Sequence, residues 1–296
     1  MGYNAPDRSR LRRAFDRAAP KFDSAATLHR EIADRMIERL SIVRLNAKVI
    51  LDAGCATGYA TKFLRKRFAR SFVIELDHSA AMLRQRENRR RTFVPWSGLQ
   101  RASVCADFQR MPLAPSSVDL VWSNLALHWA HEIPAVFAEA HRVLRPGGLI
   151  MFSMFGPDTL KELKSTFRDN DSRESDSRKN GFRVNRFVDM HDVGDVLVGS
   201  GYADPVMDME NLTLTYTNIA GLLHDLKAQG SSSTEELVHK GLAARNVYAE
   251  AVARYEAFRD GDGRVPATFE IVYGHAWKPP PRLSPTGKAV IDIRAK

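Results

Sequence analysis

Short apolar runs alternate with helix-forming segments between residues 48 and 154, and this alternation limits the possible folds more than any other feature of the chain. The apolar runs, several of them rich in β-branched residues, predict five strands at 48–52, 71–77, 102–107, 118–123 and 149–154. Most of the intervals have helical spacing, and Pro134 stands in the first turn of one such helix. Strands that alternate with helices in this way form a parallel sheet with helices on both faces. The sequence therefore predicts a doubly wound, mostly parallel α/β fold.

The first 40 residues predict two helices ahead of the sheet. Pro20 ends the first helix, and Ser24 is in position to cap the second. The second helix carries an apolar face at helical spacing, formed by Leu28, Ile32, Met36 and Leu40. We expect residues 1–40 to form an N-terminal helical lid.

Residues 41–278 form one domain in this interpretation, with its core at 48–155. The segments after the core are, in order, a polar, charge-mixed linker at 168–181, a helix at 190–198, a strand at 206–216, a helical insertion at about 217–260 and a last strand at 268–273. A basic, proline-rich tail follows at 279–296.

Composition excludes several classes of protein. Hydrophobic residues make up 44% of the chain and charged residues 27%, as in ordinary folded proteins. The only two cysteines, Cys55 and Cys105, provide no disulfide framework. No apolar run approaches the length of a membrane span, and residues 1–20 lack the apolar stretch of a secretory signal. We therefore expect a cytoplasmic protein without a membrane partner.

The 44 lysines and arginines outnumber the 35 acidic residues, which gives a net charge of +9. Such a surplus favours an acidic partner, which can be a nucleic acid, an anionic membrane surface, or an acidic protein or metabolite. The chain has no basic strand interleaved with aromatic residues and no helix-turn-helix spacing. We therefore expect no nucleic-acid partner.

A glycine-containing loop at 52–58 joins the first strand to the first helix of the sheet. In open parallel sheets, ligands bind beyond the carboxyl ends of the strands. The loop has Gly54 and Gly58 with Ala56 between them, and Asp52 precedes them. A carboxylate at this position repels a pyrophosphate and attracts a cation, so the loop predicts a cationic ligand.

Two further acids follow the next two strands. Asp77 ends the second strand, where a carboxylate can accept hydrogen bonds from both hydroxyls of a ribose. Asp107 follows the third strand and can accept from an exocyclic amine, while Phe108 beside it can stack on a ring. With the glycine loop, these residues resemble the S-adenosylmethionine (SAM) site of class I methyltransferases, which have a Rossmann-like fold.

This resemblance implies SAM as methyl donor. It implies the following cofactor-binding residues: Asp52, Gly54, Ala56, Gly58, Asp77, Met82, Asp107, Phe108 and Asn124. No metal ion is expected, because the stretch that begins at His131 breaks the usual zinc motif and no other residues have ligand spacing.

The segment at 123–129 follows the fourth strand and faces the place where the donor methyl would emerge. It lacks the Asn-Pro-Pro-aromatic run that is common in methyltransferases acting on amino nitrogen. His128 within it has three possible roles: a general base, a hydrogen-bonding partner of the substrate, or a packed structural histidine.

Several motifs along the chain resemble the biotin-pathway malonyl-[acyl-carrier protein] O-methyltransferases, the BioC group. They lie, in the family's order, at 14–23, 28–30, 123–129, 144–148, 159–163, 185–187 and 266–269. The resemblance covers about residues 10–278. The family usually has tyrosine where Phe22 stands and glutamine where His29 stands.

This resemblance implies methyl transfer from SAM to the free carboxylate of a malonyl thioester, an early step of biotin biosynthesis. The implied partner is an acidic acyl carrier protein that bears the malonyl group, or malonyl-CoA. A carboxylate of pKa about 4 is already ionised at neutral pH, so the reaction needs no general base. Candidate substrate-orienting residues are Arg186, His128, Phe22, His29 and Asn185, with Arg186 placed to form a bidentate pair.

The stretches at 154–160 and 260–268 also resemble the methyltransferase-like assembly proteins of respiratory complex I, a group associated with arginine hydroxylation. The alternatives are therefore a SAM-binding protein that modifies or assembles other proteins, and a methyltransferase for another small carboxylate.

Overall fold

The structure of the protein is a computed structural model. It describes residues 7–88, 101–166, 185, 187–231 and 242–281. The predicted linker at 168–181 and most of the predicted tail lie outside these residues. No helix within the described ranges is long and apolar enough to cross a membrane.

The described strands form one seven-stranded sheet in the order β3-β2-β1-β4-β5-β7-β6. The strands are β1 Val49–Ala53, β2 Phe72–Asp77, β3 Arg101–Cys105, β4 Val118–Ser123, β5 Leu144–Phe155, β6 Ala203–Tyr216 and β7 Val265–Trp277. The first five run parallel, and β7 is antiparallel to both of its neighbours. The predicted doubly wound, mostly parallel sheet is confirmed.

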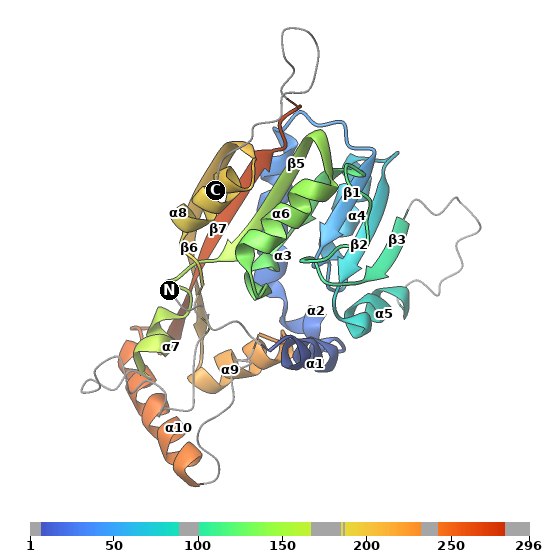
Figure 1. Ribbon diagram of the computed structural model, residues 1–296. Coiled ribbons are helices and arrows are strands. Elements are labelled where there is room, and N and C mark those ends of the chain that lie inside the picture. The colour runs from blue at the N-terminus through green and yellow to red at the C-terminus, as the bar shows by residue number, and fades with distance from the viewer. Residues whose placement is uncertain (1–6, 89–100, 167–184, 186, 232–241, 282–296) are drawn as a thin grey trace.

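Helices cover both faces of this sheet (Figure 1). The helices are α1 Arg8–Ala18, α2 Phe22–Ala25, α3 Thr27–Ser41, α4 Tyr59–Arg67, α5 Ala80–Asn88, α6 Ile133–Val143, α7 Lys161–Thr166, α8 Met190–Gly199, α9 Ile219–Ala228 and α10 Leu242–Tyr255, with 3-10 turns η1 Leu127–Trp129 and η2 Glu256–Phe258. One hydrophobic cluster joins the sheet to α3 and α4, and another joins it to α6 and α8. Helices α9 and α10 lie between β6 and β7, in the region where we expected an insertion.

The N-terminal helices differ from the prediction in one respect. Ser24 does not cap the second long helix: it lies within the short α2, and its hydroxyl donates to the carbonyl oxygen of Lys21 at 2.7 Å. Ala26 holds the N-cap position of α3 instead. Phe22 and Ala26 are buried against Met82 of α5, so residues 22–25 form a separate helical turn that the sequence pattern did not reveal.

The last strand is longer than the predicted 268–273. The predicted strand stopped at Tyr273, and the next residue is Gly274, a residue type that is disfavoured in strands. Strand β7 lies between β5 and β6 and pairs with both of them as far as Trp277. Hydrogen bonding along two edges outweighs the weak strand propensity of a single residue.

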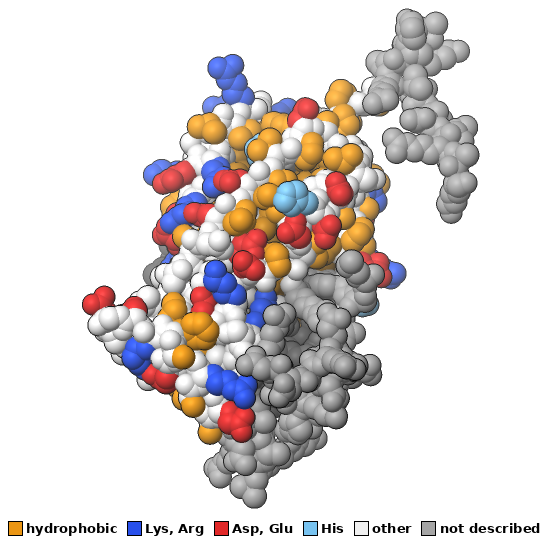
Figure 2. Space-filling view, turned by 90° about the vertical axis from the view of Figure 1, so that its left-hand side faces the viewer, with side chains coloured by type: hydrophobic (Ala, Val, Ile, Leu, Met, Phe, Trp, Pro, Cys, Tyr) orange, Lys and Arg blue, Asp and Glu red, His pale blue; other side chains and the backbone are white. Residues whose placement is uncertain are grey.

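Strand β6 forms one edge of the sheet, on the side of the molecule that faces the viewer in Figure 2. Charged side chains of both signs are interspersed with hydrophobic ones on this face (Figure 2). Asp208 and Glu210 of β6 form ion pairs with Arg39 and Arg35 of α3, at 2.7 Å and 2.5 Å. Charges on an edge strand oppose pairing with another chain.

Gly274 of β7 occupies a position where the ring of Phe152 leaves no room for a side chain. A Cβ atom at Gly274 would lie 2.3 Å from Cζ of Phe152, which is fully buried. We expect Gly274→Ala to lower the free energy of unfolding by roughly 1–3 kcal/mol, the usual cost of overpacking a core. Urea denaturation measures this change.

Gly199→Ala is the matched control, because Gly199 is exposed and a Cβ there meets no atom within 4 Å. It should change the free energy of unfolding by less than about 0.5 kcal/mol. Equal losses in both variants would contradict the steric explanation.

Candidate functional site

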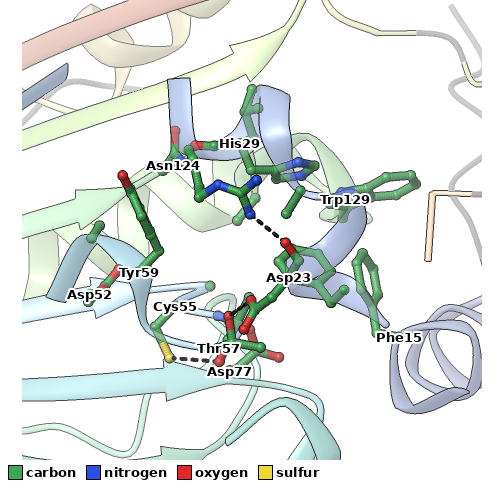
Figure 3. Close-up of a pocket in the computed structure, with 18 of the residues that line it drawn as sticks. Phe15, Asp23, His29, Asp52, Cys55, Thr57, Tyr59, Asp77, Asn124 and Trp129 are labelled. Atoms are coloured by element: carbon green, nitrogen blue, oxygen red, sulfur yellow. Dashed lines mark hydrogen bonds between the residues drawn. The ribbon is translucent and has the colours of Figure 1, made fainter. Parts of the chain in front are cut away.

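A cavity lies where the carboxyl ends of the central strands meet the N-terminal helices (Figure 3). The ends of the strands and the loops that follow them contribute Asp52, Gly54, Cys55, Ala56, Thr57, Asp77, His78, Phe108, Asn124, Leu125 and Ala126. The helices α1 to α3 and the residue between α2 and α3 contribute Phe15, Phe22, Asp23, Ala26, His29 and Arg30. Tyr59 and Ala60 of α4 and Trp129 of η1 complete the wall. The cavity therefore lies at the switch point where ligands bind in this class of fold.

The glycine loop is held in shape by the carboxylate of Asp77. One oxygen of this buried carboxylate accepts from the backbone N–H of Ala56 at 2.9 Å, and the other accepts from the backbone N–H of Ser79 at 2.8 Å. Gly54 has a φ of +77°, and a Cβ atom there would lie 2.3 Å from Cβ of Ala126. The loop therefore needs glycine at position 54 for close packing against the loop after β4 as well as for its backbone conformation.

The lining residues fit SAM in chemical type. Asp52 and Asp77 are buried carboxylates at the ends of β1 and β2, where they suit the cationic and hydroxyl-bearing parts of the cofactor. Asp52 accepts from the hydroxyl of Thr61 at 2.6 Å, which holds it in place. Phe108 lines the same cavity and offers an apolar surface to a ring.

Six of the nine predicted cofactor-binding residues line the cavity, and the other three lie around it. Gly58 occupies the N-cap position of α4 with a φ of +76°. Met82 is fully buried and packs beneath α2. Asp107 pairs with Arg8 of α1 at 3.1 Å and accepts from the backbone N–H of Gln109.

The N-terminal helices make a polar contact with each of the four loops that follow β1 to β4. We call residues 7–30 the lid from here on, since this part of the segment predicted as a lid at 1–40 makes the contacts with the loops. Its contacts are Asp23 with the hydroxyl of Thr57, Asp16 with the hydroxyl of Ser79 at 2.6 Å, Arg8 with Asp107, and the carbonyl oxygen of His29 with the amide of Asn124 at 2.9 Å. The lid therefore covers the cavity in the structure.

Aromatic rings form the apolar part of the wall on the lid side. Phe15 contacts the rings of Trp129 and His78 edge-on, with centroids 5.7 Å and 5.5 Å away. Phe22 contacts the ring of His29 edge-on at 5.3 Å. Figure 3 shows Phe15 and His29 on the lid side and Asp52 and Asp77 on the strand side. Such a wall excludes water from a bound substrate.

His29 is neutral at physiological pH in this environment. Burial, together with the positive charge of the neighbouring Arg30, lowers the pKa of His29 to about 4. Its Nδ1 atom is buried and has no hydrogen-bond partner among the described residues. His29 therefore offers a neutral polar atom to a ligand.

His128 lies behind the cavity wall and is not among the residues that line it. It is buried between the rings of Trp129, Phe155 and Phe187. The backbone N–H of Phe155 points to its Nδ1 atom at 3.4 Å, and burial lowers its pKa well below the usual value. Among the three roles considered for His128, these surroundings favour the packed structural one.

The structure brings Arg30 to the cavity, a residue that was not among the predicted site residues. Its guanidinium donates to the carbonyl oxygen of Asp23 and to the hydroxyl of Thr27 at 3.2 Å. Within the described ranges no carboxylate forms an ion pair with it. The one signal in the sequence was its place in the motif at 28–30.

The structure describes one of the two remaining predicted substrate-orienting residues. Arg186 lies outside the described residues. Asn185 is half-buried and is not among the residues that line the cavity.

In the part of the chain that the structure describes, no group of three or more His, Cys, Asp or Glu side chains is arranged to hold a metal ion.

Comparison with known proteins is consistent with this site. The family described as "Methyltransferase domain" matches residues 51–152. A protein from Methylovorus sp. (strain MP688), named malonyl-[acyl-carrier protein] O-methyltransferase, is 45% identical over 98% of this chain and 96% of its own length. A protein of the same name from Gallionella capsiferriformans is 46% identical over 98% and 97%. These relatives carry the name of the malonyl-[acyl-carrier protein] O-methyltransferases, which the motifs resemble, and not that of the complex I assembly proteins.

Solved structures share the fold at low sequence identity. The [4+2]-cyclase SpnF has a TM-score of 0.59 and 17% identity, covering 94% of this chain and 99% of its own. The YcgJ protein from Bacillus subtilis has a TM-score of 0.55 and 13% identity, covering 84% and 99%. At such identities the likeness concerns the fold alone.

The lowered pKa of His29 makes stability depend on pH. Between about pH 6.5 and pH 4 the unfolded chain binds a proton at this histidine and the folded chain does not. The free energy of unfolding should therefore fall as the pH decreases through this range. In His29→Gln we expect the free energy of unfolding to fall by roughly 1–3 kcal/mol less over this pH range than in the unmodified protein. Urea denaturation at several pH values measures this difference.

His224→Gln serves as the control, because the side chain of His224 is 71% exposed. Its pH profile should match that of the unmodified protein. An unchanged profile in His29→Gln would show that His29 titrates normally.

Proposed function

The chain belongs to the family of malonyl-[acyl-carrier protein] O-methyltransferases, and from this premise we propose that its substrate is the free carboxylate of a malonyl thioester. It is a SAM-dependent O-methyltransferase. The proposal includes the role that the sequence resemblance implied, an early step of biotin biosynthesis. Esterification hides a negative charge that enzymes of fatty-acid elongation would otherwise reject.

We assign cofactor binding to the loops after the strands. Asp77 is the acceptor for the ribose hydroxyls, Asp52 complements the positive charge, and Phe108 packs on the adenine side. When bound, SAM supplies an electrophilic methyl group on a positively charged sulfur. The hydrogen bonds that the Asp77 carboxylate accepts from the backbone N–H groups of Ala56 and Ser79 keep the loops in place before the ligand arrives.

The observation that carries the proposal is the cation that Arg30 places in the cavity. Its two hydrogen-bond acceptors, the Asp23 carbonyl and the Thr27 hydroxyl, are both neutral, so its charge is not cancelled by either. A guanidinium binds a carboxylate through two parallel hydrogen bonds. We therefore assign Arg30 to the malonyl carboxylate, the role predicted from the sequence for Arg186.

The remaining residues position the substrate and exclude water. The malonyl carboxylate is ionised at neutral pH, so no residue has to remove a proton. Phe15, Phe22 and Trp129 form an apolar wall, and exclusion of water strengthens the pairing of Arg30 with a carboxylate. His29, neutral at this pH, offers Nδ1 as a further hydrogen-bonding atom. Catalysis then depends on alignment of the reacting atoms.

The proposal extends to the acyl carrier and the compartment. We take the malonyl group to be carried by an acyl carrier protein, as the relatives' names say of them, in preference to coenzyme A. We also propose a cytoplasmic location, which is supported by the two cysteines, Cys55 and Cys105, both free thiols.

The reaction itself is tested by mass spectrometry. We expect malonyl-carrier protein incubated with the enzyme and SAM to gain the mass of one methyl group, and acetyl-carrier protein to gain none. Asp77→Ala should lose this activity and bind SAM roughly 10–100-fold more weakly, since charged hydrogen bonds contribute about 1.5–3 kcal/mol. Asp262→Ala, at an exposed acid outside the cavity, is the control. Methylation of acetyl-carrier protein would contradict the proposal.

The role of Arg30 is tested by steady-state kinetics with malonyl-pantetheine. Arg30→Ala should raise the KM for this substrate roughly 10–100-fold, because a charge-assisted pair is lost, and should leave the affinity for SAM unchanged. Arg30→Lys should recover part of the loss, since lysine keeps the charge without the bidentate geometry. Arg35→Ala is the control on the same helix, because Arg35 pairs with Glu31 and Glu210 outside the cavity. An unaltered KM in Arg30→Ala would rule out this assignment.

A further inference from the structure

The outer side of the lid carries an exposed basic surface. We call Arg13, Arg17 and Lys21 the basic face. Arg13 and Arg17 are one helical turn apart in α1, and Lys21 follows in the turn before α2. All three are exposed, and among the described residues no carboxylate forms an ion pair with any of them. Their charges are therefore available to a partner.

Two acids of the lid, Asp16 and Asp23, point away from the basic face. Asp16 accepts from the hydroxyl of Ser79, and Asp23 accepts from the hydroxyl of Thr57, both in loops that follow the strands. Residues 7–21 contain six basic side chains and two acidic ones, which accounts for four of the nine net positive charges of the chain. Asp16 and Asp23 thus face the loops after the strands, whereas Arg13, Arg17 and Lys21 face solvent.

The basic face lies beside the substrate cavity. Phe15, between Arg13 and Arg17 in the sequence, lines the cavity from the other side of the same helix. Helices α1 and α2 lie next to the carboxyl ends of the strands (Figure 1). A helix is about 10 Å across, and the flexible phosphopantetheine arm of a carrier protein spans such a distance.

The edge of the sheet offers a contrast. Charges of both signs are interspersed on the face seen in Figure 2. In the structure, Arg35 and Arg39 of α3 are paired with acids of the edge strand β6. Those arginines have their counter-charges within the chain. The unpaired cations of the basic face leave their counter-charges to be supplied from outside.

We propose that the basic face docks the acidic surface of the carrier protein that bears the malonyl thioester, so that its arm enters the cavity at the rim beside Phe15. This inference rests on the proposed function, because the substrate determines which acidic partner must reach the cavity. Complementary charge at an interface accelerates encounter and gives the association a strong dependence on salt. RNA and anionic membranes share the charge but bring no thioester to the cavity.

The test compares two substrates that differ only in the carrier. The variant combines Arg13→Ala, Arg17→Ala and Lys21→Ala. The control combines Arg65→Ala, Lys66→Ala and Arg70→Ala, which removes the same charge near the start of β2, at the opposite end of the sheet. We measure kcat/KM for malonyl-carrier protein and for malonyl-pantetheine, at low and high salt.

We expect the basic-face variant to lose on the order of tenfold in kcat/KM for malonyl-carrier protein, with a weaker dependence on salt. Its kinetics with malonyl-pantetheine should stay unchanged, which also shows that it folds. The control should behave as the unmodified enzyme with both substrates.

Three outcomes would overturn the docking surface. They are an unchanged kcat/KM for malonyl-carrier protein, an equal loss with both substrates, and an equal loss in the control variant. Binding of an RNA oligonucleotide or of phosphatidylserine vesicles that disappears in the variant, while carrier turnover stays intact, would assign the face to those partners instead.

Failure of the proposed function gives a different result. In that case the unmodified enzyme turns over neither malonyl substrate. Calorimetric titration of the enzyme with malonyl-carrier protein then tests docking directly. Binding that is lost in the basic-face variant supports the surface, and equal binding by both proteins refutes it.

Discussion

The carboxylate of Asp77 holds together the two loops on which the rest of the site depends. It accepts backbone N–H groups from Ala56 in the loop after β1 and from Ser79 in the loop after β2. Both hydrogen bonds are largely shielded from water. Hydrogen bonds to a charged group are strong in such an environment. The same carboxylate faces the cavity, so one residue both shapes the loops and offers acceptors to a ligand.

The lid is attached over these loops by several weak contacts. Each exposed or half-exposed pair, such as Arg8 with Asp107, contributes about 0.2–1 kcal/mol. The helices of the lid also have two chemically distinct sides. One presents Phe15 and Phe22 to the cavity, and the other presents arginines to solvent.

The fold alone does not determine the reaction, since the [4+2]-cyclase SpnF has the same architecture. Specificity for a carboxylate depends on which charges the cavity contains. Burial keeps His29 neutral, while Arg30 beside it remains positively charged. The lid side of the cavity thus combines the Arg30 cation, the Asp23 carboxylate and apolar rings. Asp23 already accepts from the hydroxyl of Thr57, and no ion pair joins its carboxylate to Arg30 among the described residues, so the guanidinium can pair with an anionic group of a substrate.

The strands of the parallel sheet, and the acids and glycines at their ends, could be predicted from the amino-acid pattern alone, because apolar periodicity and loop chemistry are local properties. The sequence also contains the motifs of the family. Tertiary structure decided the N-cap of α3, the length of β7 and the enclosure of His128 by aromatic rings. It also decided that Arg30 lines the cavity. These features arise from packing between segments far apart in the chain, such as Phe22 against Met82 and β7 between two partners. Local pattern carries no information about such contacts, because burial and pairing depend on the whole fold.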